Sequence, residues 1–190
     1  RGASGLGAAF ERTRGDRMGM LATVINSLAL EDELEARGCK ARVLTSTPMP
    51  TLMEPFTVER ARELLSGGWV TLFAGGTGHP YFSTDTAAAV RALEIGAQAL
   101  LKGTKVDGVY DRDPMREPGA RRFARLSLAE AIRLGLKVMD LTALALCMEH
   151  RLPIHVFQLM HPGTTRRLLS GEEQGTVVTA DEEQSKAGIA

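Results

Sequence analysis

Apolar residues recur with a helical period in the first part of the chain. Between Asp16 and Arg37 they are spaced so that a helix would place them along one stripe. The apolar positions of this stripe are Met20, Val24, Leu28 and Leu34. The pattern predicts a helix over about 16–37, and Gly38 directly after it is typical of a helix stop.

Short apolar runs follow at lengths typical of strands. They are "ARVLTS" (41–46), "WVTLFAG" (69–75), "AQALLKGT" (97–104), "IHVFQLM" (154–160) and "GTVVT" (175–179). The second and third runs are nearly uninterrupted, which predicts strands that are covered on both faces.

Helix start signals lie between these runs. Thr57 is a plausible cap for "TVERARELL", a further helix begins at Thr84, Ser127-Leu-Ala-Glu130 is a capping box, and Asp140 is placed to cap "LTALALCMEH". Strands that alternate with helices predict an α/β fold around a mainly parallel sheet.

A glycine-rich gap separates the apolar run at 69–75 from the helix that begins at Thr84. Gly75, Gly76 and Gly78 would let the backbone approach a ligand closely, while Ser83 and Thr84 place hydroxyl groups at the helix start. A helix N-terminus also presents unpaired N–H groups to an anion. The stretch therefore fits a phosphate cradle, but it fits an ordinary capped turn equally well.

Composition and charge limit the classes of function. The chain has 190 residues with 23 Lys and Arg against 23 Asp and Glu, so no net field draws it to nucleic acid or to an anionic membrane. Cys39 and Cys147 lack metal-ligand spacing, which favours free thiols in a reducing compartment. Without a membrane-length apolar run or a signal-peptide pattern, we expect a cytoplasmic protein.

Five motifs in order along the chain resemble the bacterial uridylate kinases of the amino acid kinase superfamily. They are "RGDRMGMLATVINSLAL" (14–30), "AGGTGHPYFSTDTAA" (74–88), "LKGTKVDGVYDRDP" (101–114), "LKVMDLTA" (136–143) and "HVFQLMHPGTTRRLLSGEEQGTVV" (155–178). The resemblance implies a three-layer α/β/α fold, transfer of the γ-phosphoryl group of Mg-ATP to UMP, and a hexamer built from dimers.

The resemblance also assigns an acceptor site. Asp16 matches the acid that binds the ribose hydroxyls of UMP, although an N-cap of the long helix is an alternative interpretation. The segment that matches the UMP-binding loop comprises Thr77, Gly78, His79, Pro80, Tyr81, Phe82, Ser83 and Thr84. His79 replaces the Asn of many members, which makes its contact with the base less secure.

On the donor side, the resemblance places Thr104, Tyr110 and Asp113 around ATP. Arg1 matches an arginine near the nucleotide phosphates, and Asp140 matches an acid that holds catalytic geometry. Asp113 before proline is also typical of a turn, and Asp140 is also explained as an N-cap. ATP and Mg²⁺ are the implied cofactors, while no residue is predicted to be a metal ligand because the histidines are scattered.

The start of the chain differs from this family. Uridylate kinases begin with a lysine-containing loop and a strand–helix–strand unit, and no match to these precedes Arg1. We therefore expect a longer native chain, with residues 1–179 forming one N-terminally incomplete amino acid kinase domain and residues 180–190 a disordered tail.

Two other functions stay open on the sequence. A different enzyme of the superfamily would act on a carboxylate or carbamate acceptor, and a non-catalytic relative would store an anion or oxyanion, as molybdate-storage proteins do. Allosteric control by GTP or UTP is known in the family. Glu31 and Glu35 are acidic where some members carry basic or neutral residues, which makes GTP activation doubtful here.

Overall fold

A computed structural model describes residues 11–180, and the chain divides into two compact units joined between Ile95 and Gly96. The first unit contains α1 (Arg12–Ala36), β1 (Ala41–Thr45), β2 (Glu54–Pro55), α2 (Val58–Ser66), β3 (Val70–Ala74) and α3 (Thr84–Ile95). The second unit contains β4 (Leu100–Thr104), β5 (Val109–Tyr110), β6 (Arg122–Phe123), β7 (Arg125–Ser127), α4 (Leu128–Arg133), α5 (Leu141–Glu149), β8 (Ile154–Gln158), α6 (Thr164–Leu169) and β9 (Thr176–Thr179).

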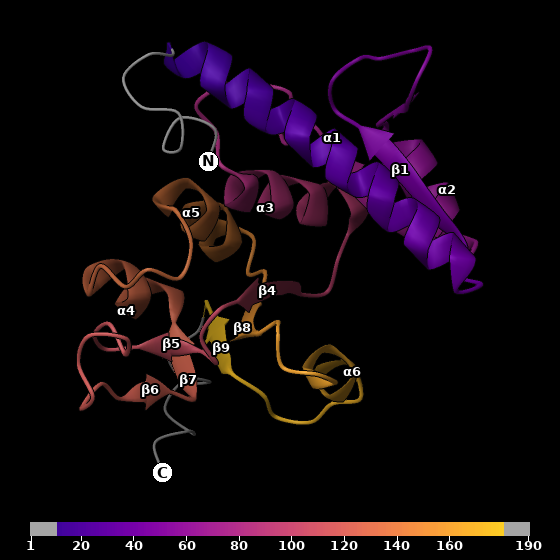
Figure 1. Cartoon of the computed structure of the whole chain (residues 1–190). Helices are drawn as coiled ribbons and strands as arrows, with labels where there is room; N and C mark the ends of the chain where they lie inside the picture. The colour runs from indigo at the N-terminus through magenta and orange to yellow at the C-terminus, as the bar shows by residue number, and fades with distance from the viewer. Residues whose placement is uncertain (1–10, 181–190) are drawn as a thin grey trace. The chain divides into compact units, whose positions relative to one another are not determined.

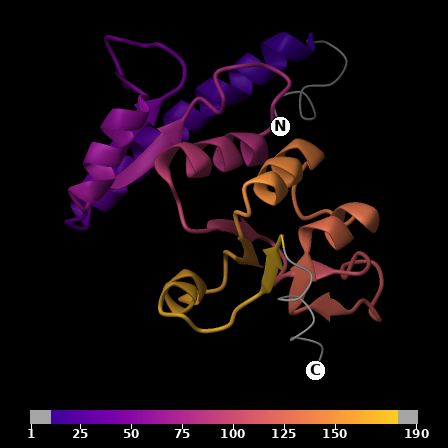
Figure 2. The same cartoon turned by 180° about the vertical axis from the view of Figure 1, so that it is seen from behind.

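The first unit is a parallel three-stranded sheet, in the order β2-β1-β3, between two layers of helices. Two opposite views place α1 across one face of this sheet and α2 with α3 across the other (Figures 1 and 2). Adjacent residues of β1 face opposite layers, because Val43 packs with Val24 of α1 and Leu44 packs with Leu64 of α2. This alternation gives the unit a separate apolar core on each face of the sheet.

The ends of the first two helices follow from local sequence. Gly38 has a φ of +79°, its N–H donates to Glu35, and the N–H of Cys39 donates to Leu34, which is the Schellman arrangement that a C-terminal glycine permits. The Oγ1 of Thr57 accepts a hydrogen bond from Arg60 N and caps α2. The predicted helix stop and the predicted cap are both confirmed.

The start of α1 differs from the prediction. The helix begins at Arg12 after an N-cap at Glu11 that makes no side-chain capping hydrogen bond. Asp16 therefore lies inside the helix, where its carboxylate pairs with Arg12 one turn earlier. The N-cap interpretation of Asp16 is wrong, and the side chain is free to point toward another element.

The second unit contains a mixed sheet in the order β4-β8-β9-β7 and a separate hairpin of β5 and β6. β8 pairs with β4 in parallel and with β9 in antiparallel orientation, and β7 pairs with β9 in parallel. Ser127 caps α4 and Asp140 caps α5, as predicted, through side-chain oxygens that accept from Glu130 N and Ala143 N. The core residues include Leu126, Leu128, Leu144, Cys147, Ile154, Val156, Phe157 and Val178.

Burial of two predicted strands is lower than their apolar sequences suggest. In β3 only Ala74 is buried and Val70 is exposed, and in β4 Leu100 is buried while Leu101 is exposed. Both are edge strands of their sheets. The expectation of strands covered on both faces is therefore wrong for β3 and β4, although both strands form where the sequence predicted them.

His155 in β8 should make the stability of the fold depend on pH. Burial, together with the charge of Arg125, lowers the pKa of His155, and its buried Nδ1 has no hydrogen-bond partner among residues 11–180. Because the unfolded chain binds this proton more readily, the free energy of unfolding should fall as the pH drops below the ordinary histidine pKa. One proton limits the slope to about 1.4 kcal/mol per pH unit.

Urea titrations between pH 5.5 and 8 measure this slope. His155→Gln should flatten it, whereas the control His79→Gln, which removes an exposed imidazole, should leave it in place. An equal slope in the parent and in His155→Gln would contradict the assignment.

No helix among residues 11–180 is both long enough and apolar enough to cross a membrane. Cys39 is exposed and Cys147 is buried, and both are free thiols, as the sequence indicated.

Candidate functional site

The glycine loop, residues 75–81, connects β3 to the segment that leads into α3. Gly75, Gly76 and Gly78 have φ values of +80°, +60° and +81°, a region that side chains disfavour. A Cβ on Gly78 would lie 3.0 Å from the Ser46 carbonyl oxygen, and one on Gly75 would lie 3.0 Å from Thr47 Oγ1. Glycine is therefore required for the backbone conformation and for the close approach of the residues after β1.

Hydrogen bonds from outside the loop hold its first residues. Gly75 N donates to Thr23 Oγ1 of α1 over 2.9 Å, and Ser46 Oγ donates to the Gly76 carbonyl oxygen over 2.9 Å. Within the loop, Gly78 N donates to the Gly75 carbonyl oxygen. The backbone of the loop is consequently fixed from α1 and from the end of β1 before any ligand arrives.

Arg91 of α3 extends this network and was not predicted as a site residue. Its Nη2 donates to Ser46 Oγ over 2.8 Å, its guanidinium lies 3.8 Å from the Phe56 ring centroid, and it pairs with Glu94. Only 12% of its side chain is exposed. Arg91 therefore orients the hydroxyl that holds Gly76, across 45 residues of sequence.

Asp16 connects α1 to the far end of the glycine loop. Its Oδ2 accepts from Tyr81 N over 2.9 Å and from Arg12 Nε over 3.0 Å. The hydrogen bond from Tyr81 N is the main cause that keeps the pKa of Asp16 below its ordinary value, with a smaller contribution from Arg12. The carboxylate is thus ionised and lies beside the predicted acceptor loop.

The remaining acceptor residues lie on the same stretch. Thr77 Oγ1 accepts from His79 N in a local turn, while Tyr81 has a φ of +72° and its exposed ring lies under the Arg12 guanidinium. Non-glycine residues seldom adopt this φ, so the Asp16 contact holds Tyr81 in a strained conformation. Pro80 and Phe82 complete the stretch, and Phe82 is exposed.

Ser83 and Thr84 have different positions at the start of α3. Ser83 Oγ accepts from Thr86 N over 3.1 Å, so this hydroxyl caps the helix. Thr84 is the first helical residue and is exposed. Thr84 is therefore the hydroxyl that remains at the surface of the helix N-terminus.

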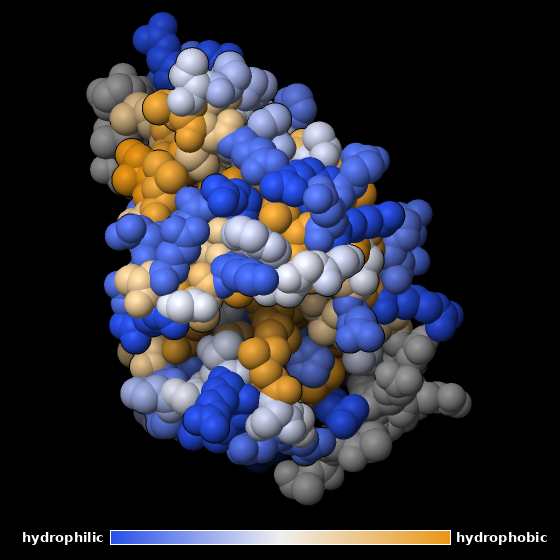
Figure 3. All heavy atoms as spheres, turned by 90° about the vertical axis from the view of Figure 1, so that its right-hand side faces the viewer, coloured by the Kyte–Doolittle hydropathy of each residue, from blue (hydrophilic) through white to orange (hydrophobic). Residues whose placement is uncertain are grey.

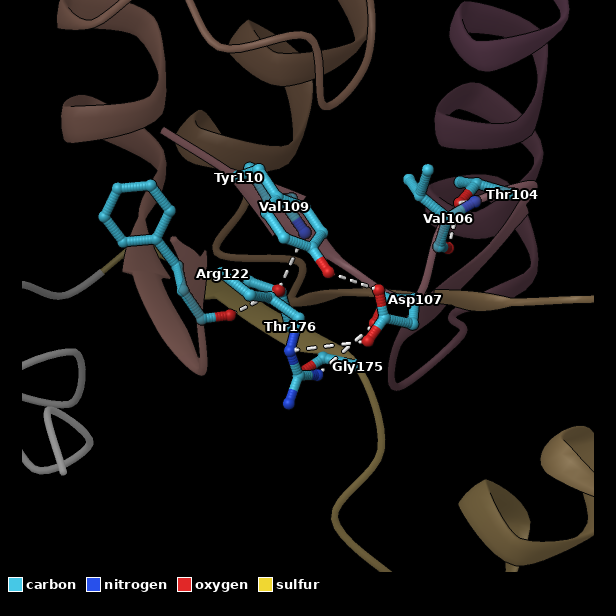
Figure 4. Close-up of polar contacts among 9 residues, drawn as sticks. Thr104, Val106, Asp107, Val109, Tyr110, Arg122, Gly175 and Thr176 are labelled. Atoms are coloured by element: carbon cyan, nitrogen blue, oxygen red, sulfur yellow. Dashed lines mark hydrogen bonds and ion pairs between the residues drawn. The ribbon is translucent and has the colours of Figure 1, made fainter. Parts of the chain in front are cut away.

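The predicted donor residues lie in the second unit, around β5. Thr104 at the end of β4 forms a turn in which its Oγ1 donates to the Val106 carbonyl oxygen over 2.6 Å (Figure 4). Tyr110 OH donates to Asp107 Oδ1 over 2.6 Å, and this hydrogen bond, with burial, raises the pKa of Tyr110. Both residues therefore have defined orientations on one connected segment.

Asp113 and Asp140 both accept hydrogen bonds from nearby backbone N–H groups. Asp113 Oδ1 accepts from Met115 N over 2.9 Å, which is the turn that an aspartate before proline favours. Asp140 Oδ1 accepts from Ala143 N at the start of α5. Arg1 lies outside the described residues.

Comparison with known proteins agrees with the resemblance found in the sequence motifs. The model of the amino acid kinase family matches residues 3–158. A uridylate kinase of Porphyromonas gingivalis is 51% identical over 179 residues, which cover 94% of this chain and 75% of that protein. A uridylate kinase of Bacteroides thetaiotaomicron is 49% identical over 178 residues, with the same coverage of 94% and 75%. The chain belongs to the amino acid kinase family.

Solved structures of this family agree with the fold. The crystal structure of UMP kinase from Bacillus anthracis matches with a TM-score of 0.88 at 36% identity, over 90% of this chain and 71% of that one. UMP kinase from Ureaplasma parvum matches with a TM-score of 0.85 at 37% identity, over 90% and 73%. The uridylate kinase resemblance and the α/β fold class are thereby confirmed.

Proposed function

We propose that this chain transfers the γ-phosphoryl group of ATP to UMP and releases UDP and ADP. The identity of 51% with a uridylate kinase over 94% of the chain carries this proposal. The preformed glycine loop between β3 and α3 supports it, because a helix N-terminus behind a glycine-rich turn is suited to a phosphate. As a kinase, the chain uses ATP as the phosphoryl donor.

The acceptor nucleotide would bind along the glycine loop and the start of α3. We assign the base to Thr77, Gly78 and His79, and the phosphate to Thr84. Asp16 would accept hydrogen bonds from the ribose hydroxyls, since a carboxylate can accept from both hydroxyls of a vicinal diol. Pro80, Tyr81, Phe82 and Ser83 would form the surrounding wall of this site.

We assign Thr104, Tyr110 and Asp113 to the donor nucleotide, Arg1 to the nucleotide phosphates, and Asp140 to holding the catalytic geometry. No group of three His, Cys, Asp or Glu side chains within residues 11–180 could hold a metal ion. Mg²⁺ at nucleotide sites takes most of its ligands from phosphates and water, so it would enter with ATP and neutralise phosphate charge. The chain itself would contribute positioning and hydrogen-bond donors, which are the main protein contributions to phosphoryl transfer.

An assay of UDP formation from UMP and Mg-ATP tests the proposal, with CMP and aspartate as alternative acceptors. We expect turnover with UMP and far less with either control. Turnover with a carboxylate acceptor would instead favour another enzyme of the superfamily. Oxyanion binding without any turnover would favour a storage protein.

The ribose contact predicts a preference for UMP over dUMP. Asp16→Asn should reduce that preference, because a neutral amide oxygen is a weaker acceptor than a carboxylate. The amide oxygen can still accept from Tyr81 N, so the loop conformation should be retained. Calorimetric dissociation constants for both nucleotides provide the measurement, and Glu33→Gln, which removes an exposed acid elsewhere on α1, is the control. Equal affinities of the parent for UMP and dUMP would exclude the ribose assignment.

We expect a homo-oligomer, and specifically the hexamer that the resemblance implies. An apolar stripe on α1 supports this expectation, because soluble monomers rarely expose such a surface. It comprises Met18, Leu21, Ile25 and Leu28, which are between 44% and 68% exposed. On the face drawn in Figure 3, hydrophobic residues also reach the surface between hydrophilic ones.

Ile25→Lys should lower the oligomeric mass measured by light scattering, because a charge in the middle of an apolar interface is costly to bury. Leu52→Lys is the control, since Leu52 is even more exposed but lies outside α1. An unchanged mass for Ile25→Lys would remove this stripe from the interface.

We propose GTP or UTP as an allosteric effector, with activation by GTP disfavoured. The position of Glu31 argues against GTP activation. Its Oε1 accepts a hydrogen bond from Val43 N over 2.9 Å, next to the residues of β1 that pair with β2. A carboxylate held in this way would oppose an anionic effector at that position.

A further inference from the structure

A polar relay in the second unit begins at the hydroxyl of Tyr110. Tyr110 OH donates to Asp107 Oδ1 over 2.6 Å, and Asp107 Oδ2 lies 3.7 Å from Arg122 Nε (Figure 4). Arg122 Nη1 in turn donates to the Gly175 carbonyl oxygen over 2.7 Å. The relay therefore runs from β5 through β6 to the residue that precedes β9.

The far end of the relay is rigid. A Cβ on Gly175 would lie 1.9 Å from the Val156 carbonyl oxygen, so its backbone is packed directly against β8. The next residue, Thr176, is fully buried, and its Oγ1 accepts from Val109 N over 2.8 Å and donates to the Phe123 carbonyl oxygen. Thr176 thus ties both strands of the β5–β6 hairpin to β9, and the Gly175 carbonyl cannot move independently of the sheet.

The near end of the relay determines where the Tyr110 ring lies. Fixing the phenol oxygen fixes the direction of the ring, and the phenolic hydrogen prefers the ring plane, so the acceptor also favours one tilt of the ring. Arg122 compensates the negative charge of Asp107, which would otherwise oppose a polyphosphate. The relay engages Tyr110 through its phenol oxygen, so the face of the ring stays available to pack against a ligand.

We propose that Asp107 and Arg122 are positioning residues that hold the Tyr110 ring for the base of ATP. This inference rests on the proposed placement of ATP at Tyr110, and it adds two residues that act through the tyrosine. Preorganised rings bind planar ligands better because less conformational freedom is lost on binding.

Binding of a non-hydrolysable ATP analogue, measured by calorimetry, tests the relay without depending on the acceptor. Asp107→Ala, Arg122→Gln and Tyr110→Phe should each weaken the analogue by about threefold to tenfold, the size expected for one lost hydrogen bond. The double variant Asp107→Ala/Tyr110→Phe should bind the analogue about as tightly as whichever of the two single variants binds it less tightly. The losses should not add, because both changes break the same contact. Arg112→Gln, whose guanidinium pairs with Glu117 and Asp111 outside the relay, is the control and should bind like the parent.

Titration of the phenol gives a second measurement, which reports the hydrogen bond between Tyr110 and Asp107 directly and independently of nucleotide binding. The chain has 2 tyrosines, so Tyr81→Phe leaves Tyr110 as the only phenol. In that background, Asp107→Ala should lower the pKa of Tyr110, because the hydrogen bond to Asp107 is the main cause that raises it. Ultraviolet absorbance of the phenolate follows the titration, with circular dichroism recorded over the same pH range to show that the fold persists.

The outcomes separate the relay from the proposed function. A lower phenol pKa, weaker analogue binding and a non-additive double variant would support the relay even if UMP were not the acceptor. Additive losses in the double variant, or analogue binding unchanged by Asp107→Ala, would overturn it. A failed UDP assay with an intact relay would count against the acceptor assignment alone.

Discussion

Gly175→Ala should unfold the second unit, while Gly171→Ala should be tolerated. Both glycines have positive φ values, +77° at Gly175 and +88° at Gly171, so an alanine at either position should cost about 1–2 kcal/mol in backbone strain. Only Gly175 faces a neighbour: its added Cβ would lie 1.9 Å from the Val156 carbonyl oxygen, whereas nothing lies within 4 Å at Gly171. We expect a total loss of at least about 4 kcal/mol at Gly175, because β8 and β9 would have to separate.

Thermal denaturation by circular dichroism, with hydrogen exchange of peptides from residues 96–180, measures this difference. The paired design removes the effect of backbone strain, which both variants share. Equal melting temperatures for the two variants would show that the contact between Gly175 and β8 relaxes without cost.

Arg91→Gln should destabilise the first unit by about 2–3 kcal/mol and loosen the glycine loop. The substitution removes the hydrogen bond to Ser46, the contact with Phe56 and the pairing with Glu94 from a largely buried site. Because Ser46 then loses its orientation, amides of residues 75–78 should exchange faster and UMP should bind about tenfold more weakly.

Two further variants separate the loop from general stability. Arg62→Gln removes an exposed guanidinium that donates to the Glu94 carbonyl oxygen, and it should change neither the loop nor UMP binding. Ser46→Ala removes the hydrogen bond to the Gly76 carbonyl oxygen and the acceptor for Arg91 Nη2, but it keeps the Arg91 side chain with its Phe56 and Glu94 contacts. It should therefore speed exchange in the loop with a stability loss of about 1–2 kcal/mol. If Arg91→Gln destabilised the unit but left exchange at residues 75–78 unchanged, Arg91 would have no role in holding the loop.

Local features of the fold were predictable from the sequence. The caps at Thr57, Ser127 and Asp140 and the stop at Gly38 depend on hydrogen bonds within a few residues. Such contacts are written in short motifs, so the sequence contains all the information that they require.

Features that depend on distant residues were not predictable. Arg91 reaches Ser46 across 45 residues, and no local pattern distinguishes it from a surface arginine. The burial of β3 depends on its position at the end of its sheet, which an apolar run does not specify. Short elements such as β2 and α6 were missed because two to six residues carry too weak a periodic signal.

The candidate site was predictable mainly through its motifs. The glycine loop and Asp16 lie together as the resemblance implied, although one residue belongs to α1 and the other segment follows β3. The dual use of Asp16, as a ligand candidate and as the acceptor for Tyr81 N, required the structure. For Asp113 and Asp140, the structure adds a turn and a helix cap.

The alternation along β1 determines how the first unit should melt. Val43 belongs to the core beneath α1 and Leu44 to the core beneath α2, although the two residues are adjacent in one strand. Loss of either helical layer therefore exposes a strand on which the other layer also depends. The two cores cannot melt one after the other, so the first unit should unfold as a single cooperative structure in which α1, the sheet and α2 are lost together.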